Sequence, residues 1–112
     1  MEVKSSSSPF GGAGRTRVLL ALSRLSESYP RELARLLEMP FSSVQKALSS
    51  LEKDGLVAGR AVGRTRVFQL DPRYFARDEL QRFLLRLSEP DLELSARVAT
   101  LRRRPRRTAK PL

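Results

Sequence analysis

The sequence contains no cysteine, no histidine and no tryptophan. Without cysteine it can form neither disulfide bonds nor thiolate zinc sites, and thiol catalysis is excluded. Without histidine it lacks the usual general base and the commonest metal ligand, so we expect a protein that is not an enzyme and holds no metal or cofactor. Its 112 residues, with five Phe, two Tyr and a hydrophobic fraction of 40%, suffice for one domain with a modest core.

Long apolar runs are also missing. The longest is Val18–Leu22, whereas a membrane-spanning helix needs roughly 18 apolar residues or more. The first residues carry charges and serines instead of the apolar stretch of a secretory signal. We therefore expect a soluble cytoplasmic protein that has no membrane partner.

Acidic residues are scarce, with 12 Asp and Glu against 22 Lys and Arg, a net charge of +10. Such a balance favours a polyanionic partner, and nucleic acid is the usual one inside a cell. Residues 102–112 hold six of the positive charges and no acid, which leaves +4 on residues 1–101. We predict a disordered basic tail at 102–112, a disordered Ser-rich segment at 1–9 and one domain at 10–101. The basic residues of the tail are Arg102, Arg103, Arg104, Arg106, Arg107 and Lys110.

The apolar spacing of the first half of the domain is helical. Val18, Leu22 and Leu25 recur at i, i+4 and i+7, which predicts a helix between Gly14 and Ser26. A second helix of about eight residues starts at Pro30, a residue suited to a first turn. Its apolar residues are Leu33, Ala34 and Leu37, and it closes near Met39 and Pro40.

A third helix follows over about 42–54. Ser42 or Ser43 can supply the N-cap oxygen, and Gly55 suits a left-handed cap at the other end. The predicted inward face consists of Val44, Ala47, Leu48 and Leu51.

The spacing then changes to that of a β-hairpin over about 56–70. One strand begins at Leu56, a turn lies within Gly59–Gly63, and the second strand covers Arg64–Leu70. A fourth helix starts after Asp71 and Pro72, and Pro90 ends it. Its stripe is Leu80, Phe83, Leu84 and Leu87, and a fifth helix is indicated by Leu94, Val98 and Leu101.

Two segments together resemble a known protein family. They are residues 31–57, RELARLLEMPFSSVQKALSSLEKDGLV, and residues 63–70, GRTRVFQL. In the order of their elements they resemble the prokaryotic winged helix-turn-helix transcriptional regulators of the ArsR and MarR type. The resemblance implies a mainly α fold with a small β-hairpin: a three-helix core, a two-stranded wing and one or two C-terminal helices.

Three positions of the helix-turn-helix can be compared with that family. Its small residue on the first helix corresponds to Ala34, and its apolar residue after the turn corresponds to Val44. The family commonly has glycine in the turn, where φ is positive, whereas this chain has Glu38. A residue other than glycine costs on the order of 1 kcal/mol there, so we expect this turn to differ locally.

The resemblance implies that the third helix enters the major groove of DNA. Its outward face would carry Ser42, Ser43, Gln45, Lys46, Ser49 and Lys53. Gln45 can pair with adenine, Lys46 can reach guanine or phosphate, and the serines can bond phosphates or bases. The same side chains suit an ordinary solvated helix face equally well.

The predicted hairpin carries Arg60, Arg64 and Arg66, with no acid between Asp54 and Asp71. In the family this wing lies along the DNA backbone or in the minor groove, which suits arginine. Exposed cations also protect edge strands from pairing, and both roles can hold at once. The arginines of the tail would add contacts that do not depend on the DNA sequence.

Some leucines fall outside the predicted stripes, among them Leu20 and Leu85. The first and last helices of the resembled regulators pair across a twofold axis, which would bury such residues. The interface predicted in this way consists of Leu20, Leu80, Phe83, Leu84 and Leu87. Alternatively, the fourth helix only covers the core of a monomer.

The leading hypothesis is a homodimeric, sequence-specific regulator of transcription bound to double-stranded DNA on the nucleoid. The alternative is a winged-helix module that binds protein or RNA and has only non-specific affinity for nucleic acid. No polar cluster defines a site for a small-molecule effector, and the sequence leaves open whether a small molecule, a protein or no effector controls the regulator. Target sequence, target genes and the sign of regulation cannot be derived from the residues.

Overall fold

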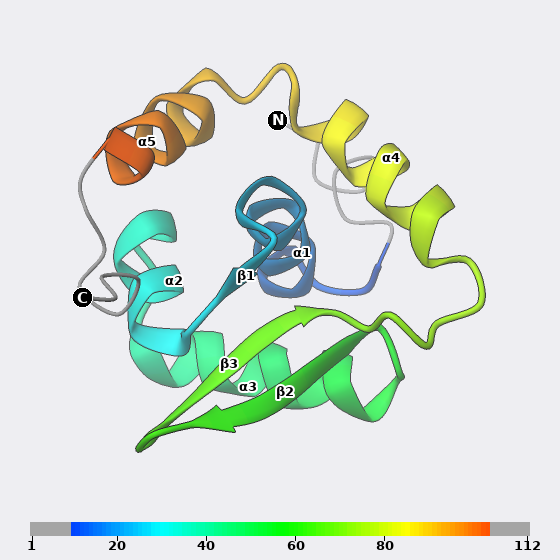
Figure 1. Cartoon of the computed structure of the whole chain (residues 1–112). Coiled ribbons are helices and arrows are strands. Elements are labelled where there is room, and N and C mark those ends of the chain that lie inside the picture. The colour runs from blue at the N-terminus through cyan, green and yellow to red at the C-terminus, as the bar shows by residue number, and fades with distance from the viewer. Residues whose placement is uncertain (1–9, 104–112) are drawn as a thin grey trace.

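The computed structural model describes residues 10–103, which form five helices and a small antiparallel sheet (Figure 1). The mainly α architecture predicted from the sequence is confirmed. In chain order the elements are α1 (Ala13–Leu25), β1 (Glu27–Ser28), α2 (Pro30–Leu37), α3 (Phe41–Lys53), β2 (Val57–Val62), β3 (Thr65–Leu70), α4 (Arg77–Ser88) and α5 (Leu92–Arg103). Within this range no helix is long and apolar enough to cross a bilayer.

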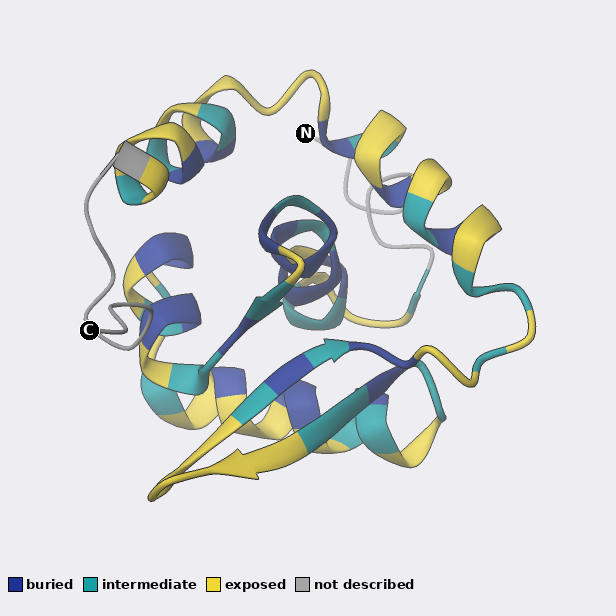
Figure 2. Cartoon of the chain, viewed as in Figure 1, coloured by how far each residue is buried: buried dark blue, intermediate teal, exposed yellow. Residues whose placement is uncertain are grey.

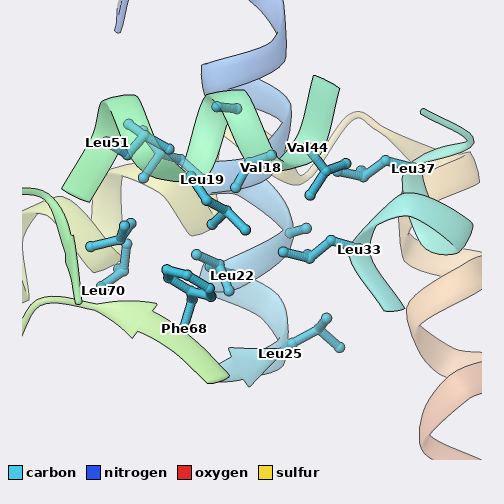
Figure 3. Close-up of a cluster of buried hydrophobic side chains, with 14 of the residues drawn as sticks. Val18, Leu19, Leu22, Leu25, Leu33, Leu37, Val44, Leu51, Phe68 and Leu70 are labelled. Atoms are coloured by element: carbon cyan, nitrogen blue, oxygen red, sulfur yellow. The ribbon is translucent and has the colours of Figure 1, made fainter. Parts of the chain in front are cut away.

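Helix α1 lies at the centre of the molecule, and the other elements surround it (Figure 1). Its Val18, Leu19 and Leu22 are completely buried, so the helix is buried on more than the one stripe predicted for it. Figure 3 shows these side chains meeting Leu33 of α2 and Phe68 of β3. Hydrophobic burial around α1 therefore holds the helix-turn-helix and the sheet in one unit.

The turn between α2 and α3 has the backbone conformation that the resemblance requires. Glu38 adopts the left-handed conformation, with φ 54° and ψ 47°. The turn therefore does not differ, although the residue is not glycine, and the strain is on the order of 1 kcal/mol. Two arginines hold the end of α2: the guanidinium of Arg17 donates to the carbonyl of Leu37, and that of Arg97 donates to the carbonyl of Leu36.

Helix α3 begins earlier than predicted. Pro40 is its N-cap, and the carbonyl of Pro40 accepts the N–H groups of Ser43 and Val44 at 3.0 and 3.1 Å. The prediction that Ser42 or Ser43 caps the helix is therefore wrong, because both serines already lie within its first turn. The left-handed cap is confirmed at Gly55, whose φ is 81°.

The sheet has one more strand than predicted. Its order is β1-β3-β2, and β1 pairs Glu27 with Gln69 and Ser28 with Phe68. A strand of two residues is too short to show the alternation of apolar and polar residues by which strands are recognised in a sequence. The turn was also predicted too early: Val62 pairs with Thr65, so β2 continues through Gly59 and the turn residues are Gly63 and Arg64.

Helix α4 begins five residues after Pro72, later than predicted. Asp71 first forms a turn, in which its carboxylate accepts the backbone N–H of Arg73 at 2.8 Å. The fifth helix is confirmed, with Leu94 and Val98 buried.

The last helix extends further toward the C-terminus than predicted. Helix α5 runs through Arg103, so the tail predicted from residue 102 starts too early. Arg102 donates from its guanidinium to the carbonyl of Arg24, near the end of α1. The predicted disorder of residues 1–9, and of the tail with Arg104, Arg106 and Arg107, lies outside the described residues.

Candidate nucleic-acid interface

Helix α3 has one buried face and one exposed face, as predicted. The buried side chains are Val44, Ala47, Leu48 and Leu51. The exposed ones include every residue predicted to contact DNA from this helix: Ser42, Ser43, Gln45, Lys46 and Ser49 (Figure 2). Ala34 is partly buried against the hydrophobic core, in keeping with its correspondence to the small residue of the motif. The face is polar, carries cations and is open to a partner.

The three arginines of the hairpin are exposed but do not stand in equivalent surroundings. Arg60 pairs with Glu27 of β1, at 3.0 Å between Nη2 and Oε1. Arg66 reaches Glu52 of α3 with both terminal nitrogens, at 3.3 and 2.9 Å. Their apparent isolation from acids is a feature of the sequence only, because both carboxylates come from other elements.

Arg64 is different from its two neighbours. It occupies the hairpin turn next to Gly63, whose φ is 64°. No carboxylate between residues 10 and 103 pairs with it. Arg64 is therefore the wing arginine whose charge is most available to an anionic partner.

The pair of Arg66 and Glu52 ties the hairpin to α3. Hydrogen bonds from Arg66 lower the pKa of the Glu52 carboxyl, with a further contribution from the charge of Arg66 and the backbone of Gly59; desolvation opposes them. The lowered pKa means that the pair stabilises the fold above the ordinary pKa of glutamate and loses this effect as the pH falls through the lowered value. Because both side chains are partly exposed, the pair contributes at most about 1 kcal/mol.

Gly59 makes room for this arrangement. A Cβ at this position would lie 2.6 Å from Nη2 of Arg66 and 2.7 Å from Cε2 of Phe68. The guanidinium of Arg66 also lies over the ring of Phe68, at 4.9 Å from the ring centroid. A glycine in β2 thus lets two side chains of β3 lie flat across the neighbouring strand.

Substitution of Gly59 by alanine should therefore destabilise the protein by about 1 to 3 kcal/mol, because the ring and the guanidinium must move. Urea unfolding measures the change. Gly12→Ala is the matched control, since no atom lies within 4 Å of a Cβ at that position. If Gly59→Ala unfolded like the unaltered protein, Arg66 would not be held in the place described.

A groove of about 420 Å³ lies between the start of α2, the exposed side of α3 and the hairpin. Gln45 and Ser49 of α3 line it, together with Arg64 and Arg66 of the hairpin. A further arginine lines it that the sequence analysis did not single out: Arg31, whose guanidinium lies 4.3 Å from the ring centroid of Phe41. Arg31 lies far from the hairpin in the sequence, and only the fold brings it to the same groove as the wing arginines. For this reason no local pattern in the sequence could have indicated it.

The residues predicted to form a dimer interface differ in how far they are buried. Leu80 and Leu84 are buried in the core of the single chain, because α4 packs across α1. Their assignment to an interface therefore needs correction. Leu20 and Leu87 are partly buried, and Phe83 is 49% exposed. Leu85 and Leu92 are further exposed apolar side chains on α4 and α5.

No family model and no curated protein matches this sequence. Solved structures do match its fold. The adhesin competence repressor (AdcR) from Streptococcus pyogenes is similar with a TM-score of 0.61 and 19% identity, over 88% of this chain and 72% of that chain. A transcription regulator of the MarR family is similar with a TM-score of 0.60 and 21% identity, over 84% of this chain and 72% of that chain. The winged helix-turn-helix fold implied by the resemblance is thus confirmed.

Proposed function

We propose that this protein is a sequence-specific DNA-binding regulator of transcription that acts as a homodimer on the nucleoid and has no catalytic activity. The observation that carries the proposal is the exposed polar face of α3 beside the Arg64 tip of the hairpin. One structural neighbour is described as a repressor and the other as a transcription regulator, which supports the proposal. An α-helix with its side chains is about 10 to 12 Å across, so α3 fits the major groove, which is about 12 Å wide.

The exposed residues of α3 have the chemistry needed to read bases. The amide of Gln45 can donate to and accept from the same adenine edge, and Lys46 can donate to guanine or to a phosphate. The hydroxyl groups of Ser42, Ser43 and Ser49 can donate or accept. These side chains make α3 the proposed source of sequence preference. Arg64 and the basic tail would supply affinity through phosphates.

A dimer would place two copies of α3 on two half-sites about one helical turn apart. The proposed interface retains Phe83, with Leu20 and Leu87 at its partly buried edge. Leu85 and Leu92 add apolar surface to the same part of the chain. A domain of this size gains burial by pairing, which supports this arrangement.

Selection of bound sequences from random duplex DNA at near-physiological salt tests the proposal. We expect enrichment of an inverted repeat whose half-sites are separated by about one helical turn. Enrichment of a single half-site would contradict the dimer. No enrichment would contradict sequence-specific binding and would favour the winged-helix module that binds protein or RNA.

Gln45→Ala should relax the base preference at one or two positions of the selected site, at about 1 to 3 kcal/mol for a lost bidentate contact. Titration of the variant against single-base variants of the site measures this. Gln69→Ala is a matched control, because Gln69 lies in β3 between the inward-facing Phe68 and Leu70 and so points to the other side of the sheet. A uniform loss of affinity across all sequences would instead assign Gln45 to the DNA backbone.

A further inference from the structure

We infer that the groove between α2, α3 and the hairpin holds one sugar–phosphate backbone of duplex DNA, with Arg31 and Arg64 as phosphate contacts on its opposite walls. The inference rests on the proposed function and adds to it the part of the DNA that this groove takes. It also assigns Arg31, which lies outside both α3 and the wing, to the interface.

The shape of duplex DNA is the first argument. Its major and minor grooves are neighbours, and one sugar–phosphate backbone forms the ridge between them. A protein that inserts a helix into one groove and a hairpin tip into the next must accommodate that ridge between the two elements. The groove of about 420 Å³ is bounded by α3 on one side and by the hairpin on the other, and it therefore lies where the ridge would pass.

The charge of the lining is the second argument. Three arginines line the groove, Arg31, Arg64 and Arg66, and no Asp or Glu does so within the described residues. Arg31 and Arg64 take part in no ion pair with a carboxylate between residues 10 and 103, whereas Arg66 is paired with Glu52. Two unneutralised cations from different elements suit an anion that passes between them.

The position of Arg31 is held without neutralising its charge. Its guanidinium lies 4.3 Å from the ring centroid of Phe41, the first residue of α3. Stacking on a ring restricts the side chain and leaves the edge of the guanidinium free to donate to a phosphate oxygen. Gln45 lies one helical turn after Phe41 and lines the same groove. A phosphate on Arg31 would therefore lie beside the bases that α3 is proposed to contact, while Arg31 itself contributes affinity that does not depend on the DNA sequence.

Arg66 has a positioning role in this arrangement. Its two bonds to Glu52 join β3 to α3 and so fix the distance between the walls of the groove. The carboxylate cancels much of the charge of Arg66, so this arginine forms part of the groove without being one of the two phosphate contacts.

The test uses the full chain, the selected duplex and an unrelated duplex, each titrated at several salt concentrations. For Arg31→Ala and for Arg64→Ala we expect equal losses of affinity on both duplexes, with the slope of log K against log salt smaller by about 0.9 for each lost phosphate contact. Arg31→Gln, which keeps a long polar side chain, should behave like Arg31→Ala. Arg82→Ala removes the same charge from an exposed site on α4 and should leave the slope unchanged.

A second measurement identifies the phosphate itself. Single phosphates of the selected duplex are replaced in turn by uncharged methylphosphonates. We expect a position between the two contacted grooves whose replacement weakens the unaltered protein but has little further effect on Arg31→Ala. An unchanged salt slope, a change of base preference, or additive effects at every position would overturn the inference while leaving the proposed function intact. Failure of the unaltered protein to bind either duplex would overturn both.

Discussion

Leu84→Ala is expected to lower the free energy of unfolding by about 2 to 5 kcal/mol, the largest effect of any single substitution considered for this protein. Leu84 is completely buried where α4 packs across α1. The substitution removes apolar contacts and leaves a cavity that its neighbours fill only in part. Since those neighbours belong to the same chain, the loss should be the same at every protein concentration. Urea unfolding over a range of concentrations measures it.

Leu85→Ala is the matched control, because it makes the same change at the next residue of the same helix, where the side chain is 37% exposed. Its effect on the free energy of unfolding should stay below about 1 kcal/mol at low protein concentration. The contrary outcome is also informative. If Leu84→Ala left the dilute protein unaffected and destabilised only the concentrated one, Leu84 would belong to an interface between two chains, as the sequence alone predicts.

Removal of residues 104–112 should weaken binding to every DNA sequence alike. The deleted segment contains Arg104, Arg106, Arg107 and Lys110. If all four meet phosphates, the slope of log K against log salt falls by about 3.6, which corresponds to up to about 10³-fold in affinity at 0.15 M salt. Titrations of both the selected and an unrelated duplex at several salt concentrations measure the change.

The place of the cut matters to this experiment. A cut after Leu101 would also remove Arg102, whose guanidinium bonds the carbonyl of Arg24 at the end of α1, and so would mix a loss of stability with a loss of charge. A full-length variant with glutamine at the four basic positions separates charge from length, and it should reproduce the truncation. An unchanged slope in both variants would show that the tail does not contact DNA.

Several features of the fold were predictable because their causes are local. The stripe of Val18, Leu22 and Leu25 indicates α1, and the two faces of α3 follow from the spacing of its apolar residues. The turn at Glu38 was not predicted correctly: without glycine it was expected to differ locally, yet Glu38 adopts the left-handed conformation. The caps were less predictable. Serine is a good N-cap residue, yet the carbonyl of Pro40 already accepts the first N–H groups of α3. The helix therefore begins before the two serines.

The composition and periodicity of the sequence determined that this chain is basic and mainly helical, with a polar outward face on α3. The tertiary structure alone decided which charges on that surface remain available. Glu27 and Glu52, distant in sequence, pair with two of the wing arginines, whereas Arg31 joins Arg64 at the groove. It also decided that Leu84 belongs to the core. The physical reason is that helical spacing depends on neighbouring residues, whereas ion pairing and burial depend on which distant elements the packing around α1 brings together.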